Sequence, residues 1–405
     1  MKGNNTGLAG INGTPSFFVV GDVAVKFRQS APAILIGVVI VVIATVSVVS
    51  NLISHRMAAS FEETQFVLMG QIMQSKLSGA EGKALAAAES LSSMPPVIKA
   101  FSEQDRAALL AATQGSFKVL HEKHGISQAQ FHLAPALSFL RVHNPEKFDD
   151  DQSKFRQMVV EVNRANGIRK GIEVTSSGIG IFGTLPLADE AGRAIGSFEM
   201  ALEFGPLLDE LKRAYGFELA LFINEKILHE TATSLKGDIF NEQNRVGPYV
   251  KFYSTHPELL RTLVGSGDIN ITEDAHYLRE ANGVPHGVLL QPIYNYAKKQ
   301  IGVVAMARDF SATRLADGQA VVWQTLLGVL SAMLLAGAIL IVLRGMVTRP
   351  LAVLNERIAA MADGAPEREL SGAPGWCDEM RELAQSCERL VNQAPADKPA
   401  AGDAS

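Results

Sequence analysis

Two long apolar stretches dominate the pattern of hydrophobic and polar positions along this chain. Each holds 26 consecutive residues without a formal charge, at 29–54 and at 318–343. A helix rises about 1.5 Å per residue and needs roughly 20 apolar residues to cross the hydrocarbon core of a membrane. The pattern therefore predicts two transmembrane helices, over 29–54 and over 318–343.

The residues that flank these stretches predict their orientation. The relevant cations are Lys26, Arg28, Arg344, Arg349 and Arg357. Because Lys and Arg concentrate on the cytoplasmic side of a membrane, we expect both termini in the cytoplasm. Residues 55–317 are then outside, in the periplasm if the membrane is the inner membrane of a Gram-negative cell. A cleaved signal peptide is the alternative for the first stretch, but such signals have an apolar core of only about 7–15 residues.

A helical pattern follows the first predicted span. From 60 to 124 the chain is rich in Ala, Glu, Gln, Lys and Met, and its apolar residues recur every three or four positions. They include Phe66, Met69, Ile72, Met73 and Leu77. This spacing predicts a stalk helix over 55–124 with one apolar stripe. The helix is expected to be kinked or broken at Pro95-Pro96, because proline has no backbone N–H to donate to the helical hydrogen bond. Such a stripe is typical of packing against a second copy or against an adjoining domain.

Beyond Gly125 the pattern changes to strands and turns and contains an internal repeat. Alternation predicts strands over 128–143, a helical period covers 151–164, and 172–187 is glycine-punctuated and β-like. PLADEAGRAIGSFEMALEF and PIYNYAKKQIGVVAMARDF share four residues at an offset of 106. Pro186, Ile195, Gly196 and Phe204 recur as Pro292, Ile301, Gly302 and Phe310. We therefore expect an α+β fold with two tandem modules, distal (125–205) and proximal (206–315), each an antiparallel sheet with helices on one side.

The stalk and the two P-x(8)-IG hairpins between two spans resemble the double Cache sensor domain of bacterial chemoreceptors and sensor kinases. FHLAPALSFLRVHNPEKFDDD, which begins at Phe131, is similar to the membrane-distal module of one Cache subclass. The resemblance covers roughly 60–315. It implies PAS-like modules of which the distal one binds a small molecule, often a carboxylate or an amino acid, and the proximal one relays the signal.

The distal module offers candidate ligand-binding residues. Along 138–143, period-two alternation places Phe139, Arg141 and His143 on one strand face, where the arginine can offer a bidentate fork to a carboxylate. His132, Arg156 and Glu173 are close enough in sequence to contribute. An organic anion is the ligand that this set favours. In the alternative reading, Arg141 pairs with Asp149, Asp150 or Asp151 and binds no ligand.

Signals for catalysis, metals and nucleic acids are missing from the sequence. It has no G-x-S-x-G elbow, P-loop or H-E-x-x-H motif, and the pair His121 and His124 lacks a third metal ligand. We expect no catalytic residue, metal or cofactor. With 42 Asp and Glu against 37 Lys and Arg, a formal net charge of -5, no nucleic-acid partner is expected. Both cysteines, Cys377 and Cys387, follow the second predicted span, in agreement with a reducing compartment there.

A heptad pattern follows the second span directly. Val347, Leu351, Leu354, Ile358 and Met361 are spaced 4, 3, 4 and 3, as in a coiled-coil seam. Pro350 is placed at the first turn, where a missing donor is harmless, and Gly364 is expected to end the helix. Asp378 and Glu379 then open a second helix and complement its dipole. The apolar positions of this second helix are Met380, Leu383, Cys387 and Leu390.

This arrangement over 344–392 resembles a HAMP relay, and Arg349-Pro350-Leu351 and Asp378-Glu379 match its most recognisable positions. The resemblance implies a parallel four-helix bundle in a homodimer. We assign signal relay to Pro350, Leu351, Leu354, Gly364, Asp378 and Glu379.

These patterns together predict a homodimeric, two-span sensor in the inner membrane, with a cytoplasmic segment over 1–28 and a disordered tail over 393–405. Its signal is expected to reach a separate kinase, cyclase or chemoreceptor, since no effector domain follows the predicted relay. An effector-less receptor remnant that acts as a scaffold, dimerisation partner or membrane anchor is the alternative. An external hydrolase ranks below both, because no nucleophile and base are recognisable.

Overall fold

The computed structural model describes residues 27–235, 237–362 and 376–393. They belong to two compact units. One comprises 54–318, and the other comprises the described residues before 54 and after 318. Gly364, the connector around it, the N-terminal segment before 27 and the predicted tail after 393 lie outside the described residues.

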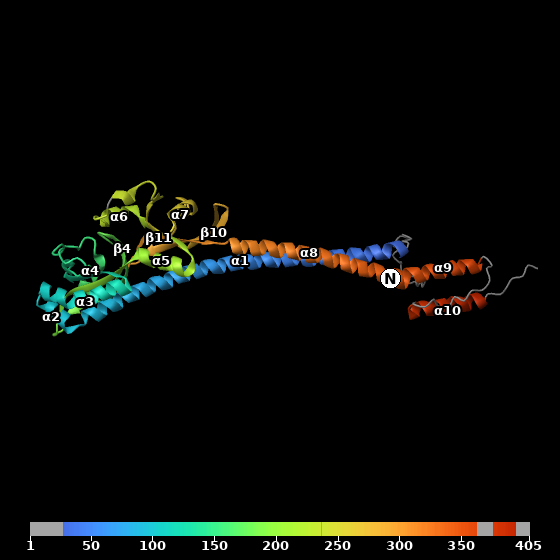
Figure 1. The fold of residues 1–405 in the computed structure, drawn as a ribbon, viewed down its shortest axis with the longest axis horizontal. Coiled ribbons are helices and arrows are strands. Elements are labelled where there is room, and N and C mark those ends of the chain that lie inside the picture. Colours follow the sequence, from blue (N-terminus) through green and yellow to red (C-terminus); the bar gives the residue numbers. More distant parts are fainter. Residues whose placement is uncertain (1–26, 236, 363–375, 394–405) are drawn as a thin grey trace, which may run out of the picture. The chain divides into compact units, whose positions relative to one another are not determined.

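The helical segment predicted over 55–124 is three helices and not one (Figure 1). They are α1 (Phe27–Ser92), α2 (Pro95–Ser102) and α3 (Arg106–His124). The break after Ser92 is the predicted one, since α2 begins with the proline pair. Asp105 starts α3, because its carboxylate accepts a hydrogen bond from the Ala108 amide at 2.9 Å. Gly125 ends it in the left-handed conformation, with φ of 69°.

The distal module is a five-stranded antiparallel sheet with the order β2-β1-β5-β4-β3. Its elements are β1 (Ile126–Leu133), β2 (Leu137–Arg141), α4 (Gln157–Ala165), β3 (Arg169–Thr175), β4 (Gly178–Ala188) and β5 (Ala194–Glu203). The predicted helix over 151–164 thus begins later than its apolar period suggested. The residues before Gln157 instead form an irregular segment over the sheet.

The proximal module is a six-stranded sheet with the order β7-β8-β6-β11-β10-β9. Its helices are α5 (Phe204–Tyr215), α6 (Glu225–Thr231), a 3₁₀ turn (Gly237–Phe240) and α7 (Pro257–Leu263). Its strands are β6 (Glu218–Asn224), β7 (Arg245–Val246), β8 (Tyr249–Ser254), β9 (Ala275–Ala281), β10 (Val284–Tyr294) and β11 (Gln300–Asp309).

The repeated hairpins have the same register in both modules. Pro186 pairs with Ser197 in one, and Pro292 pairs with Val303 in the other, again at an offset of 106. The shared glycine lets a third strand approach closely. A Cβ on Gly196 would lie 2.2 Å from the His132 carbonyl oxygen, and one on Gly302 would lie 2.3 Å from that of Phe222. The sequence repeat is therefore a structural repeat, and its glycines are needed for backbone contact.

The apolar stripe of the stalk packs against the adjoining modules. Phe66, Met69 and Met73 belong to the core of the proximal module. Further along α1, Ala80, Ala84 and Ala88 are buried. A Cβ on Gly183 of β4 would lie 2.3 Å from the backbone nitrogen of Leu85, so the helix rests directly on the distal sheet. Of the two partners predicted for the stripe, the adjoining domain is the one seen here.

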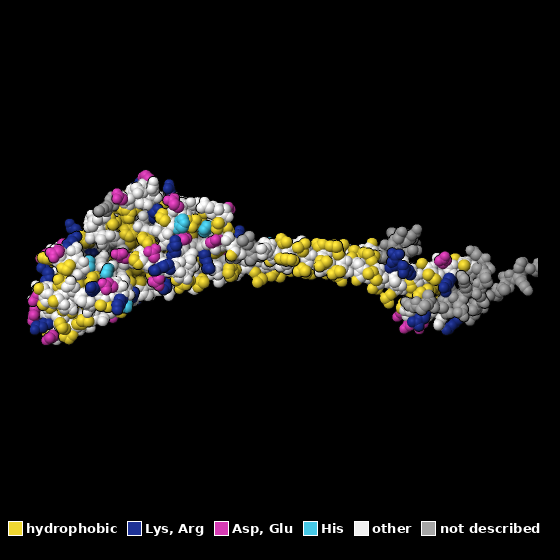
Figure 2. Space-filling model, viewed as in Figure 1, with side chains coloured by type: hydrophobic (Ala, Val, Ile, Leu, Met, Phe, Trp, Pro, Cys, Tyr) yellow, Lys and Arg dark blue, Asp and Glu magenta, His cyan; other side chains and the backbone are white. Residues whose placement is uncertain are grey.

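The second unit contains two helical stretches that are long and apolar enough to cross a membrane. The first belongs to α1 and the second to α8 (Ser311–Val342). Hydrophobic side chains cover their surface (Figure 2). At Gly328 of α8, a Cβ would lie 3.1 Å from the Ser47 hydroxyl of α1, so the two stretches pack closely at this point.

A helix pair follows α8 after a π-helical turn (Leu343–Thr348): α9 (Arg349–Ala362) and α10 (Asp378–Gln393). The predicted acidic pair Asp378 and Glu379 opens α10. Leu354 packs with Trp376 and Ala384 in a small core. Four of the predicted seam residues stay exposed within one chain, namely Leu351, Ile358, Leu383 and Leu390.

Candidate functional site: a buried charged network in the distal module

One face of the distal sheet carries an unusual set of buried polar side chains. Directly paired residues of neighbouring strands share a face of the sheet. His132 of β1 is paired with Ser197 of β5, and Glu199 of β5 is paired with Thr184 of β4. Glu173 belongs to the same face, from β3. Helix α4 contacts β3, β4 and β5 and covers this side. The opposite face is apolar, and the ring centres of Phe131 and Phe198 lie 4.2 Å apart there.

Arg156, just before α4, joins two carboxylates across the sheet. Its Nη1 donates to Oε1 of Glu199 at 2.6 Å, and its Nη2 donates to Oε2 of the same residue. Its Nε donates to Oε2 of Glu173 at 3.0 Å. The guanidinium carbon lies 4.5 Å from the centre of the Phe182 ring. Arg156 is only 3% exposed and Glu199 1%, so the network is withdrawn from water.

Burial and pairing set the charges of this network. Burial opposes ionisation of Glu199, but attraction to the Arg156 guanidinium outweighs it and lowers the pKa of the Glu199 carboxyl to about 2. Burial raises the pKa of the Glu173 carboxyl, although Arg156 and the Met158 amide counteract it. Glu199 is therefore the ionised partner of the arginine, and Glu173 is the carboxyl closer to protonation.

His132 and Ser197 have unused hydrogen-bonding capacity beside this network. Both are completely buried. The Nε2 atom of His132 lies 3.3 Å from Oε1 of Glu199, outside hydrogen-bond alignment. Among the described residues, neither ring nitrogen of His132 nor the Ser197 hydroxyl has a hydrogen-bond partner. Burial lowers the pKa of His132, more than Glu199 raises it, so the imidazole is neutral and retains one donor and one acceptor.

Arg141 is bound by an aspartate, the alternative considered for it. Its two terminal nitrogens donate to the two carboxylate oxygens of Asp150 at 2.6 and 2.7 Å. Those hydrogen bonds hold the pKa of the Asp150 carboxyl well below its usual range. Gln152 donates to Asp150 at 3.0 Å and accepts from Gln130, which also donates to Ser138. Arg141 thus belongs to a polar chain on the same sheet face as the Arg156 network.

The predicted position of Phe139 is wrong. A register shift between Phe131 and His132 in the pairing with β2 interrupts the alternation at Phe139. Phe139 therefore lies in the apolar core, with its ring 5.5 Å from that of Phe101. His143 follows β2, where its Nδ1 lies 3.1 Å from the Ala129 carbonyl oxygen. The structure brings together His132, Arg156 and Glu173, with Arg141 on the same face.

Sequence reasoning missed Glu199 and Ser197. Both stand in β5, where they alternate with the buried apolar residues Phe198 and Met200. Two polar residues at period two in an otherwise apolar strand are the signal that could have identified this face. No group of three His, Cys, Asp or Glu residues that could hold an ion occurs within the described ranges, and His121 instead approaches the Ile126 carbonyl oxygen at 2.9 Å.

Residues 70–313 match the dCache_3 family, described as the double sensory domain of two-component sensor kinases. The match spans more than half of the chain, which therefore belongs to this family, as its resemblance to double Cache domains predicted. The family is a sensory one. No curated protein matches the chain.

The solved structures that match the chain include two chemoreceptor domains and one ligand-binding receptor. The Campylobacter jejuni chemoreceptor Tlp3 sensory domain, with isoleucine bound, is 12% identical (TM-score 0.38, 64% of this chain and 97% of that one). The ligand-binding domain of the Pseudomonas aeruginosa amino acid chemoreceptor PctC, in complex with GABA, is 16% identical, with a TM-score of 0.35. This match covers 62% of this chain and 99% of that one. An extracellular ligand binding receptor from Desulfohalobium retbaense is 13% identical, with a TM-score of 0.35. This match spans 60% of this chain but only 39% of the receptor.

Proposed function

We propose that this chain is a homodimeric membrane sensor with two spans, whose segment 55–317 lies in the periplasm and binds a small organic acid in the distal module. The signal passes through the HAMP-like helix pair within 344–392 to a separate kinase, cyclase or chemoreceptor. Membership of a sensory family and the two apolar helices that flank the matched region support the overall scheme. The distribution of Lys and Arg around the two apolar stretches supports a cytoplasmic position for both termini.

The observation that carries the ligand class is the pair His132 and Ser197. Both side chains are buried without a hydrogen-bond partner in the described structure, and an unsatisfied buried polar group costs about 1–3 kcal/mol. A neutral imidazole and a hydroxyl can each donate one hydrogen bond. Two donors suit the oxygens of a carboxylate, so an acid group would satisfy atoms that the protein leaves unsatisfied.

The relay requires that the ligand favour one of two arrangements of the protein, since a ligand that binds both equally shifts nothing. The exposed seam residues Leu351, Ile358 and Leu383 support a second copy as the partner of α9 and α10. Apolar residues at heptad spacing are covered when helices associate in a bundle. The dimer would thus complete the four-helix arrangement through which movement of α8 reaches an effector.

The test uses the full chain in lipid nanodiscs and a panel of small organic acids, amino acids and amines. Acids are expected to raise the melting temperature, because a ligand that binds only the folded state stabilises it. Ser197→Ala should weaken the affinity for the best acid by roughly threefold to tenfold without loss of stability, because that hydroxyl has no partner to lose. The exposed Ser102 gives the control, Ser102→Ala. If no acid shifts the melting temperature, or if Ser197→Ala binds unchanged, the assignment of this site is wrong.

A second measurement separates a relay from a scaffold. An effector that co-purifies with the full chain but not with a truncation at residue 343 would support the relay. The scaffold alternative predicts that a bound protein does not change its activity when ligand is added.

A further inference from the structure

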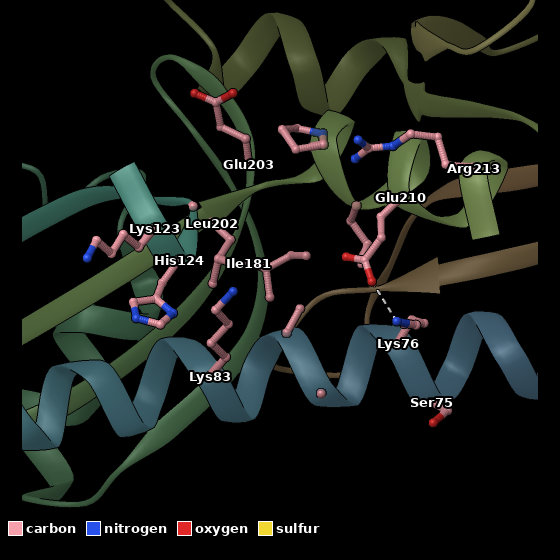
Figure 3. A pocket seen from close by; sticks show the side chains of 15 residues that line it. Ser75, Lys76, Lys83, Lys123, His124, Ile181, Leu202, Glu203, Glu210 and Arg213 are labelled. Atoms are coloured by element: carbon pink, nitrogen blue, oxygen red, sulfur yellow. Dashed lines mark hydrogen bonds and ion pairs between the residues drawn. The ribbon is translucent and has the colours of Figure 1, made fainter. Parts of the chain in front are cut away.

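A groove of about 550 Å³ lies on the opposite side of the distal sheet from the charged network. Its walls are the stalk part of α1, the end of α3 and one side of α5 (Figure 3). Ile181 of β4 and Leu202 of β5 form part of its apolar lining. They face away from Thr184 and Glu199, because side chains three positions apart on a strand point to opposite faces. This volume is within the range of small-molecule sites.

Cations gather at both ends of the groove. Figure 3 shows Lys76 and Arg213 at one end, Lys83 and Lys123 at the other, and Ile181 between them. Lys76 is already paired, with its Nζ 2.6 Å from Oε1 of Glu210. The other three basic side chains form no ion pair with any described residue. Within the described part of the chain, Arg213 forms one side-chain hydrogen bond, from its Nε to the Asp209 carbonyl oxygen at 3.3 Å, which leaves its terminal nitrogens available.

The electrostatic balance of the groove is positive. The lining includes four Lys and Arg residues but only two carboxylates, Glu203 and Glu210. The hydrogen bond from Lys76 lowers the pKa of the Glu210 carboxyl, and Lys83 and Arg213 lower it further. An anion that entered the groove would therefore meet cations whose charges the protein has not neutralised.

The stalk leaves space for a ligand through its small residues. Gly79 and Ala80 line the groove, and a Cβ on Gly79 would have no atom within 4 Å. Gly79 lies in the interior of α1, where glycine is less stable than alanine by about 1 kcal/mol, and no close contact requires it. An apolar middle with unpaired cations at both ends suits an elongated molecule that carries an acid group at each end.

We propose that this groove is a second ligand site, distinct from the charged network, and that it takes an organic dianion whose two acid groups are joined by an apolar spacer. Lys83 and Lys123 bind one acid group, Arg213 binds the other, and the spacer packs on Ile181 and Leu202. Such a ligand would join the stalk to α5, the first helix of the proximal module. The binding itself does not depend on the function proposed above.

The test is calorimetric titration of the full chain in nanodiscs with straight-chain dicarboxylates from succinate to sebacate, and with monocarboxylates of the same lengths. One or more dicarboxylates are expected to bind, more tightly than the matched monocarboxylate and more weakly as NaCl is raised. Lys83→Gln should weaken this binding by about fivefold, and Gly79→Leu should abolish it by filling the groove.

Two matched controls use helices outside the groove. Gly115→Leu makes the same change at another helical glycine without neighbours within 4 Å, and Lys99→Gln removes an exposed lysine of α2. Both should bind dicarboxylates as the wild type does. Absence of dicarboxylate binding by the wild type would overturn the proposal. So would binding that persists in Gly79→Leu, or groove variants that change the oligomeric state and thereby mark the groove as a subunit interface.

Variants in the charged network separate this proposal from the other one. Ser197→Ala should leave dicarboxylate binding in the groove unchanged, and Lys83→Gln should leave binding at the network unchanged. If Ser197→Ala abolishes dicarboxylate binding, the dicarboxylate occupies the network and the groove is not its site.

Discussion

Removal of Arg156 tests whether the buried network is held together by charge. Arg156→Met keeps a side chain of similar length and leaves Glu173 and Glu199 buried, at 5% and 1% exposed, without their common partner. Loss of one member of a buried ion pair costs about 3–5 kcal/mol, because the remaining charge is uncompensated. For a unit of this size, each kcal/mol changes the melting temperature by roughly 2–4 °C. We therefore expect a decrease of roughly 6–20 °C.

The assay is thermal unfolding of the full chain in nanodiscs, followed by near-ultraviolet circular dichroism, with Arg169→Met as the control. Arg169 pairs with Glu161 at 2.9 Å, but both side chains are about one-third exposed, and such pairs contribute about 0–1 kcal/mol. Adding Glu173→Gln and Glu199→Gln to Arg156→Met should restore part of the lost stability, since no charge then stays buried. A loss in Arg156→Met no larger than that in Arg169→Met would refute the reasoning.

Three other predictions concern pH, the stalk and the helix pair. Because burial lowers the pKa of His132 and His143 below the ordinary 6.5, the unfolded chain binds more protons as the pH falls through 6.5. Stability should therefore decrease from about pH 8 to about pH 5.5, less steeply in His132→Gln, as measured by urea unfolding; equal slopes would contradict this. Gly183→Ala should cost about 1–3 kcal/mol because its Cβ meets the α1 backbone, whereas Gly115→Ala should be neutral or slightly stabilising in the same assay. With both native cysteines replaced, Leu351→Cys should form disulfide-linked dimers readily and Glu356→Cys should not, as read by non-reducing electrophoresis; similar yields would argue against the proposed seam.

The elements predicted best were those in which one physical pattern decides the structure. Charge-free stretches, the proline pair and the repeated hairpins each depend on local chemistry, and the register of Pro186 with Ser197 is reproduced at Pro292 with Val303. Residues 151–156 have a helical period but contribute Arg156 to the network and Gln152 to the polar chain instead. Tertiary hydrogen bonds overrode the local pattern there.

The candidate site was harder to predict, because its contacts are set by strand order. Arg156 and Glu199 are 43 positions apart and meet only because β5 lies between β1 and β4 in the sheet. Period-two alternation predicts which face of a sheet a side chain occupies only where the strand register is regular. The single shift beside Phe139 moved that residue into the core, while Arg141 stayed on the polar face. Charged residue types pointed to the right module, but the pairing partners required the fold.

The position of Glu173 gives the charged network a physical connection to the rest of the chain. Its neighbour in β3, Ile172, accepts a hydrogen bond at 3.1 Å from the amide of Tyr296, in the turn between β10 and β11. At Gly171, with φ of 147°, a Cβ would lie 3.1 Å from the Tyr296 backbone, so the two modules touch through main chain. Strand β11 leads from that turn directly into α8. A ligand that changed the hydrogen bonds of Arg156 would act on β3 through Glu173. Because packed elements shift as units, a movement of β3 would also move Tyr296. Under the proposed function, the ion pair expected to stabilise the distal module is therefore also well placed to report on a ligand bound there.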